Sequence, residues 1–203
     1  MTGALSEWES FYVIVGSSAG ALTGLQFVVM ALISDLGRRA TEDTIGAFAS
    51  PNIVHFCVVL FMSAVLSAPW ENIASADWVL GAVAVAGLVY ATIVNRRAHR
   101  QKGYDPVLED WIFHIILPYA SYGMLLVACV VLNRDRTLAL FMFGGVSLLL
   151  MFVGIHNAWD TATFLVAQRV NEKAGQQPSQ PSDSQPHQEQ SPPPPADNSG
   201  TPS

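Results

Sequence analysis

The sequence has 203 residues, of which 51% are hydrophobic and only 13% are charged, and its formal net charge is −6. Because soluble domains carry about 25% charged residues, the composition argues against a soluble domain, and the acidic balance offers no basic patch for nucleic acid. The charges gather between five long apolar runs and in the C-terminal tail. We therefore expect an all-α integral membrane protein of the plasma or inner membrane, surrounded by the lipid bilayer.

Five runs are long and apolar enough to be membrane-spanning helices, which need ~20 mostly apolar residues. A short extracytoplasmic segment, residues 1–10, precedes them, and the transmembrane domain extends over residues 11–170 because helical character continues after the fifth run. The expected spans are residues 11–34, 47–68, 78–95, 111–132 and 138–160. The sequence thus predicts a five-helix transmembrane bundle.

Three glycines in the first run, Gly16, Gly20 and Gly24, are spaced about one helical turn apart. Each would cost a water-soluble helix roughly 0.5–1 kcal/mol relative to alanine. In lipid, no hydrophobic effect draws helices together, and small residues permit the close backbone approach that does. The stripe therefore predicts a packing surface of the glycine-zipper type, either against another helix of the chain or across a homo-oligomer.

The distribution of Lys and Arg predicts the orientation of the bundle. With five spans, the N-terminus and the second and fourth loops share one side, which carries only Arg134 and Arg136. The first and third loops and the tail share the other side, which carries Arg38, Arg39, Arg96, Arg97, Arg100, Lys102, Arg169 and Lys173. Because basic loops stay in the cytoplasm, we expect the N-terminus outside and the C-terminus inside. No basic residue precedes the first run, so it should remain as a helix rather than act as a signal peptide.

Three histidines lie in or at the ends of the predicted spans: His55, His114 and His156. Ionisable residues inside a membrane are costly and are the first place to look for function, and no Asp, Glu, Lys or Arg lies deep in any span. The dipeptide Ser50-Pro51 is a good helix start, a capping hydroxyl followed by proline at the first helical position. If the second helix starts there, the three histidines can share one layer near the cytoplasmic face.

Two carboxylates are spaced to support these histidines. Asp110 precedes His114 by four residues, and Asp160 follows His156 by four, so each pair shares a helix face. A carboxylate that accepts a hydrogen bond from one ring nitrogen fixes the tautomer and raises the basicity of the other nitrogen. Both pairs therefore strengthen the prediction of a polar site in this layer.

The fourth helix continues this polar stripe. The stripe consists of residues that fall within a roughly 120° arc at about 100° per residue: Asp110, His114, Pro118, Ser121 and Tyr122. Because proline has no N–H, Pro118 removes the helical hydrogen bond to the carbonyl of His114 and favours a kink there. Ser121 and Tyr122 are accordingly further candidates for the polar site.

A layer of histidines and carboxylates suits several functions. Our preferred interpretation is a small non-enzymatic bundle, transporter-like or binding a metal or a proton, with His55, His114 and His156 as metal ligands and a transition metal such as Zn as the cofactor. One alternative is a structural or regulatory membrane subunit that oligomerises or binds partners and whose histidines only tie helices together. A further alternative is a membrane-embedded metalloenzyme that acts on lipid.

The enzymatic alternative has the least support from the sequence. The segment Gly16-Ser17-Ser18-Ala19-Gly20 lies in an apolar run and lacks the strand–turn–helix context of a nucleophile elbow. There is no H-x-x-x-H, H-E-x-x-H or C-x-x-C pattern. The two cysteines both lie inside apolar runs and are expected to be buried apolar side chains. We therefore expect no catalytic residues.

The C-terminal segment, residues 171–203, differs from the rest of the chain. It contains eight of the 12 prolines and has no apolar periodicity. Such a segment cannot bury enough apolar surface to offset its conformational entropy, so we expect a disordered cytoplasmic tail. The SPPPPA segment favours local polyproline II, which a partner that binds proline-rich ligands could recognise.

Overall fold

The computed structural model describes the backbone of residues 3–35, 50–70, 73–98 and 111–175, and the side chains of residues 7–31, 51–70, 75–96 and 111–163. Within these ranges the chain is helical and contains no strand. The elements in chain order are α1 (Gly3–Asp35), α3 (Ser50–Ser67), α4 (Ile73–Ala98), the π-helical turn η2 (Ile112–Ile116), α6 (Leu117–Leu132) and α7 (Arg136–Gly175). The predicted all-α class is confirmed.

Four of these helices contain segments that are long and apolar enough to cross a membrane: Glu7–Ala31, Ser75–Arg96, Ile112–Leu132 and Arg136–Thr163. The fifth apolar helix, Pro51–Ser67, is shorter. Its described part begins at Ser50, next to the proline that suits a first helical turn. Helix α4 extends to Ala98, into the predicted loop 95–110, and α7 extends to Gly175, into the predicted tail 171–203. Any earlier start of α3, the rest of the predicted loops 35–44 and 95–110, and the tail after residue 175 lie outside the described residues.

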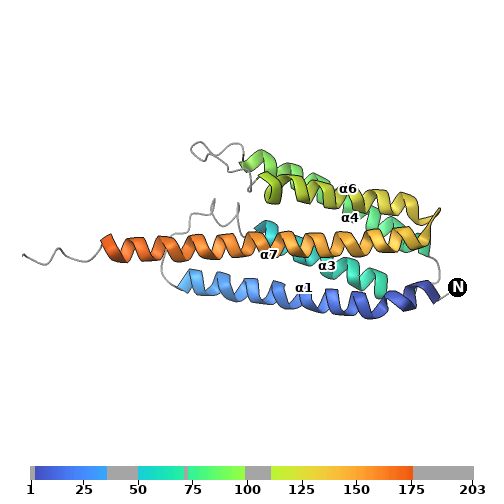
Figure 1. Cartoon of the computed structure of the whole chain (residues 1–203), viewed down its shortest axis with the longest axis horizontal. Helices are drawn as coiled ribbons and strands as arrows, with labels where there is room; N and C mark the ends of the chain where they lie inside the picture. The colour runs from blue at the N-terminus through green and yellow to red at the C-terminus, as the bar shows by residue number, and fades with distance from the viewer. Residues whose placement is uncertain (1–2, 36–49, 71–72, 99–110, 176–203) are drawn as a thin grey trace, which may run out of the picture.

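Helix α7 is the central element of the bundle (Figure 1). The pair α1 and α3 lies on one side of it and the pair α4 and α6 on the other. At its N-terminus the carboxylate of Asp135 accepts a hydrogen bond from the backbone N–H of Leu138 at 3.0 Å, which satisfies one of the free donors of the first turn. Helix α7 then extends past the other helices at its C-terminal end (Figure 1).

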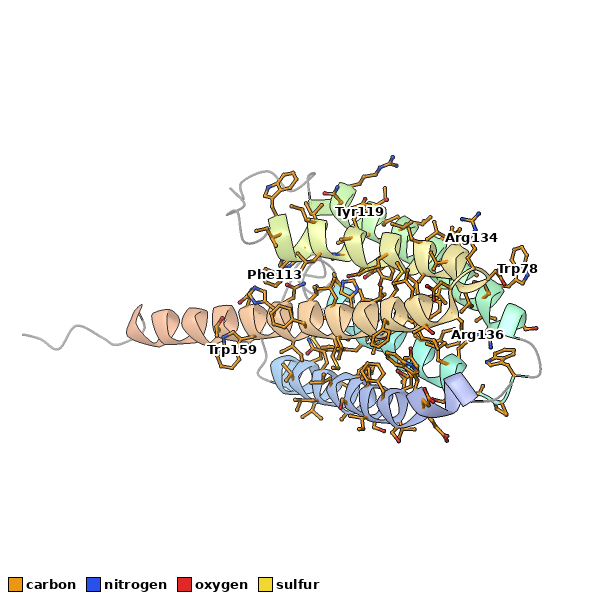
Figure 2. The ribbon with its side chains drawn as sticks, turned by 45° about the vertical axis from the view of Figure 1, so that its right-hand side comes forward. Trp78, Phe113, Tyr119, Arg134, Arg136 and Trp159 are labelled. Atoms are coloured by element: carbon orange, nitrogen blue, oxygen red, sulfur yellow. The ribbon has the colours of Figure 1, made fainter. Side chains whose placement is uncertain are left out.

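Most buried side chains between the helices are apolar, and large apolar side chains also cover the outside. The largest fully buried side chains include Tyr12, Phe56, Met62, Tyr122 and Phe143. On the outside, Trp78 is 81% exposed near one end of the bundle and Trp159 is 69% exposed toward the other (Figure 2). Tryptophans at two opposite ends of an apolar surface match the two interfaces of a bilayer.

The helices approach most closely at individual glycines. A Cβ added at Gly87 of α4 would overlap the ring of Tyr122 on α6, and one added at Gly154 of α7 would lie 2.6 Å from Cε1 of Phe56 on α3. Close backbone approach at small residues is the usual way in which helices associate in lipid. At these two glycines, an aromatic ring packs on the backbone of the neighbouring helix, α6 on α4 and α3 on α7.

The three glycines of the predicted stripe on α1 differ in how closely the neighbouring helix approaches them. A Cβ at Gly16 would lie 2.7 Å from Cβ of Ser63, so α1 packs closely on α3 at this point. At Gly20 the nearest atom, in Leu60, would be in ordinary contact at 3.8 Å, and at Gly24 no atom lies within 4 Å. Within the described chain, the stripe thus opens from a tight contact with α3 at Gly16 to a free surface at Gly24.

Candidate functional site

Polar side chains that are buried or half-buried gather at one end of the bundle, where α3 begins and α4 ends. Asn52 and His55 lie in the first two turns of α3, His114 lies in η2, and Asn157 lies on α7. Asn52 is 0% exposed, His55 3% and Asn157 2%. A polar group buried in hydrocarbon is stable only with hydrogen-bond partners or water. This end of the bundle is therefore the natural place for a site.

A hydrogen bond joins His55 of α3 to Tyr122 of α6. The imidazole Nδ1 and the phenolic oxygen are 2.9 Å apart, and both side chains are buried. The hydrogen of this bond lies on the tyrosine or on the histidine according to the tautomer. In either case Nδ1 is committed to Tyr122, and Nε2 is the ring nitrogen left for a second contact.

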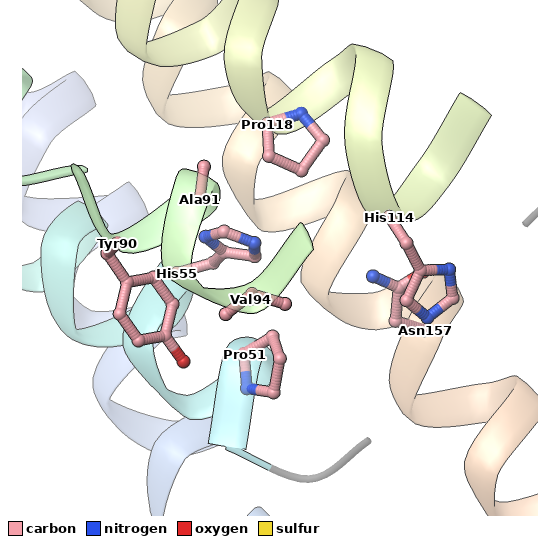
Figure 3. A pocket seen from close by; sticks show the side chains of 8 residues that line it. All are labelled: Pro51, His55, Tyr90, Ala91, Val94, His114, Pro118 and Asn157. Atoms are coloured by element: carbon pink, nitrogen blue, oxygen red, sulfur yellow. The ribbon is translucent and has the colours of Figure 1, made fainter. Parts of the chain in front are cut away.

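A small pocket opens beside the His55 ring. Its lining comes from four helical segments: Pro51 and His55 of α3, Tyr90, Ala91 and Val94 of α4, His114 of η2 with Pro118 of α6, and Asn157 of α7. The cavity volume, counted as the space that the centre of a water molecule can occupy, is about 10 Å³. In Figure 3, His55 lies on one side of the pocket and His114 with Asn157 on the other. We refer to this space as the His55 pocket.

The amide oxygen of Asn157 is buried at this pocket without a hydrogen-bond partner among the described residues. Leaving a buried acceptor unsatisfied costs about 1–3 kcal/mol. Such groups in proteins are normally bonded to protein or to ordered water. Asn157 therefore requires a donor that the described part of the chain does not supply.

The buried side chain of Asn52 also lacks hydrogen-bond partners in the described part of the chain. Neither its amide oxygen nor its amide nitrogen has a partner among the described residues. Helices α3 and α7 run antiparallel (Figure 1) and touch where Phe56 packs on Gly154. One turn toward the N-terminus of α3 from Phe56 is Asn52, and one turn toward the C-terminus of α7 from Gly154 is Asn157. The two asparagines thus lie at one level of the bundle.

The π-helical turn positions His114 at the pocket. The backbone N–H of Leu117 donates to the carbonyl of Ile112, five residues earlier, and Pro118 follows with no N–H to donate. A single π-turn before a proline shifts the helical register, and such turns are frequent at functional sites. The sequence predicts a kink at Pro118, and the structure has a π-helical turn immediately before this proline. Both His114 and Pro118 lie in the pocket lining.

His156 is not part of the pocket lining. Its ring stacks on Phe113, with centroids 3.5 Å apart, and its Nε2 lies 3.1 Å from a carboxylate oxygen of Asp160. Both side chains of this pair are partly exposed. The structure thus brings His55 and His114 together at one pocket and places His156 beside it, on the neighbouring face of α7 from Asn157.

No group of three or more His, Cys, Asp or Glu side chains in the described ranges is arranged to hold a metal ion. Asp110, the predicted partner of His114, lies outside those ranges. Ser121 is fully buried and donates to the carbonyl of Leu117 in its own helix at 2.8 Å, so its hydroxyl serves α6 itself. Of the predicted candidates, His55 and His114 line the pocket, and Tyr122 is hydrogen-bonded to His55.

Sequence reasoning missed Asn52, Tyr90 and Asn157. The two asparagines could have been identified from the sequence, because an amide side chain inside an apolar run is as costly to bury in lipid as an imidazole. No family model matches this chain, and no curated protein or solved structure matches it either. Its function is therefore inferred from its own side chains.

Proposed function

We propose that this chain is a non-enzymatic, transporter-like membrane protein that binds a proton at the His55 pocket, in a bundle of five spans with its N-terminus outside and its C-terminus in the cytoplasm. The observation that carries this proposal is the double role of His55. Its buried imidazole is bonded to Tyr122 through Nδ1 and also lines a pocket with His114 and Asn157. A histidine that only tied two helices together would need no such pocket.

The chemistry of the lining favours a proton over a metal ion. A zinc site uses three or four ligands such as imidazoles, thiolates and carboxylates, whereas the pocket offers two imidazoles, one amide and otherwise apolar or aromatic side chains. Histidine is the side chain whose ordinary charge change falls nearest neutral pH. Two of them in a polar layer of a membrane bundle are well suited to bind and release protons.

The test is a histidine titration in the intact protein. The full chain, labelled with ¹⁵N-histidine and held in lipid nanodiscs, is followed by NMR between pH 4 and 9. We expect the ¹⁵N shifts of His55 to report uptake of a proton within this range, and we expect Tyr122→Phe to move the midpoint. Tyr119→Phe is the matched control, because Tyr119 lies on the same helix but bonds Thr92 instead.

A His55 that keeps one neutral tautomer from pH 4 to 9 would contradict proton binding. The histidine would then be a tie between α3 and α6, and the chain would be a structural or regulatory subunit. Large shifts of the His55 and His114 signals on addition of Zn²⁺ would instead favour a metal-binding bundle.

A further inference from the structure

The size of the His55 pocket limits what it can hold. A space of about 10 Å³ for the centre of a water-sized sphere corresponds to roughly one water molecule. A hydrated cation or an organic solute is several times larger. A bare cation would need several oxygen ligands, and the side-chain oxygens in the lining are those of Asn157 and Tyr90.

The polar atoms around the pocket match the hydrogen bonds of a water. The amide oxygen of Asn157 is buried, lines the pocket and lacks a donor among the described residues. The Nδ1 atom of His55 is bonded to Tyr122, so Nε2 is the ring nitrogen available to the pocket. We propose that the pocket holds one water molecule, bonded to Oδ1 of Asn157 and Nε2 of His55, and that this water delivers the proton to His55.

This inference rests on the proposed function and names its substrate class, a proton carried by water. When Nδ1 carries the ring hydrogen and donates it to the oxygen of Tyr122, the lone pair of Nε2 faces the pocket. A hydronium formed from the pocket water gives one proton to Nε2, which leaves a neutral water and an imidazolium. Release is the reverse step, in which the proton on Nε2 returns to the water.

The pocket is closed toward the far end of the bundle. Tyr122 is fully buried against Gly87, and beyond it Val59, Leu125 and Leu150 are fully buried. The buried side chain of Ser63 lies away from these residues, at the contact of α3 with Gly16 of α1. Ser147, farther along α7, donates to its own helix. We therefore expect water and protons to reach His55 from the end of the bundle that holds His114 and Asn157.

Water contact can be measured directly in the full chain. Solid-state NMR in lipid bilayers transfers magnetisation from water to protein nuclei at rates that depend on proximity. We expect His55 and Asn157 to build up signal at least five times faster than Val59 and Leu125 in the dry core. Asn157→Leu removes the acceptor and fills the space, so it should slow the transfer to His55 to the rate of the core.

A second variant guards against a folding defect in the first. Ala91→Leu fills the pocket from α4 without removing a polar group, and it should slow the transfer to His55 in the same way. The matched control is Ala86→Leu, because Ala86 is exposed on the same helix. The signal of the His55–Tyr122 hydrogen bond, retained in all variants, reports that the bundle is intact.

Slow transfer to His55 in the unmodified protein would show a dry pocket and overturn the inference, whether or not His55 titrates. Fast transfer with no titration would support the water site and refute proton binding. Fast transfer that persists in both Asn157→Leu and Ala91→Leu would place the water elsewhere and overturn the assignment to this pocket.

Discussion

At the scale of single residues, the central feature is the hydrogen bond between the buried side chains of His55 and Tyr122. An imidazole buried in an apolar core needs a partner on each ring nitrogen. Tyr122 supplies one at 2.9 Å, and the pocket supplies space for the other. A neighbouring tyrosine, Tyr119, makes a bond of equal length to Thr92 but in a partly exposed position. The two tyrosines on one helix therefore allow a direct comparison.

We predict that Tyr122→Phe lowers the free energy of unfolding by about 1–3 kcal/mol, because the ring still fills its space while Nδ1 of His55 loses its partner. Tyr119→Phe should cost less, about 0.5–1 kcal/mol, since Thr92 keeps its bond to the carbonyl of Leu88. Reversible unfolding in mixed micelles, followed by circular dichroism, gives both values. Equal losses of free energy for the two variants would mean that the His55–Tyr122 bond contributes no more to stability than the partly exposed Tyr119–Thr92 bond.

The residues of this site were only partly predictable from the sequence. His55 and Tyr122 stand out because each is a polar group in an apolar run, and helical spacing places Tyr122 with His114. Their mutual contact depends on α3 and α6 both packing on α7, which no pattern within one helix encodes. Asn157 is adjacent to His156 in the chain but about 100° away around the helix. On α7 the sequence predicts His156 as the site residue, and this residue lies on the face beside the pocket.

At the scale of elements, the helices approach one another most closely at single glycines. The stripe of Gly16, Gly20 and Gly24 was identifiable by its period, yet its contact with α3 is tight only at Gly16. The closest approaches elsewhere occur at Gly87 and Gly154, each opposite an aromatic ring. An isolated glycine has no period to detect, and its role is fixed by the large side chain of another helix.

We predict that Gly87→Ala destabilises the protein by about 1–3 kcal/mol, as expected for overpacking. The added methyl would overlap the ring of Tyr122, and that ring is held by its bond to His55. The matched control is Gly81→Ala on the same helix, where no atom lies within 4 Å of the added carbon. That variant should be neutral or slightly stabilising.

Unfolding in mixed micelles measures both variants. A second readout separates simple destabilisation from a specific effect on Tyr122, because a displaced ring should also alter the NMR signals of His55. If Gly87→Ala were as stable as Gly81→Ala and left those signals unchanged, the close contact between α4 and α6 would be refuted.

At the scale of the whole molecule, the number of spans depends on α3. Four helices have segments of membrane length, and α3 has a shorter apolar segment, Pro51–Ser67. At 1.5 Å per residue such a helix covers about 26 Å, slightly less than the ~30 Å of a typical hydrocarbon core. A mismatch of this size is accommodated at modest cost by local thinning of the bilayer. Helix α3 also lies lengthwise between α1 and α7 (Figure 1), as a spanning helix would.

We predict that α3 spans the membrane and that the two ends of the chain therefore lie on opposite sides. Eight of the ten Lys and Arg residues would then share the cytoplasmic side with the C-terminus. Compartment-specific reporters placed before residue 1, beside Arg134 and after residue 203 test this arrangement. We expect the first two reporters outside and the third inside. The Arg134 site is the internal control, because α7 separates it from the C-terminus in any arrangement in which α7 spans. If α3 instead lay on one side of the membrane, the four remaining spans would bring the first and third reporters to the same side, and the five-span bundle would be refuted.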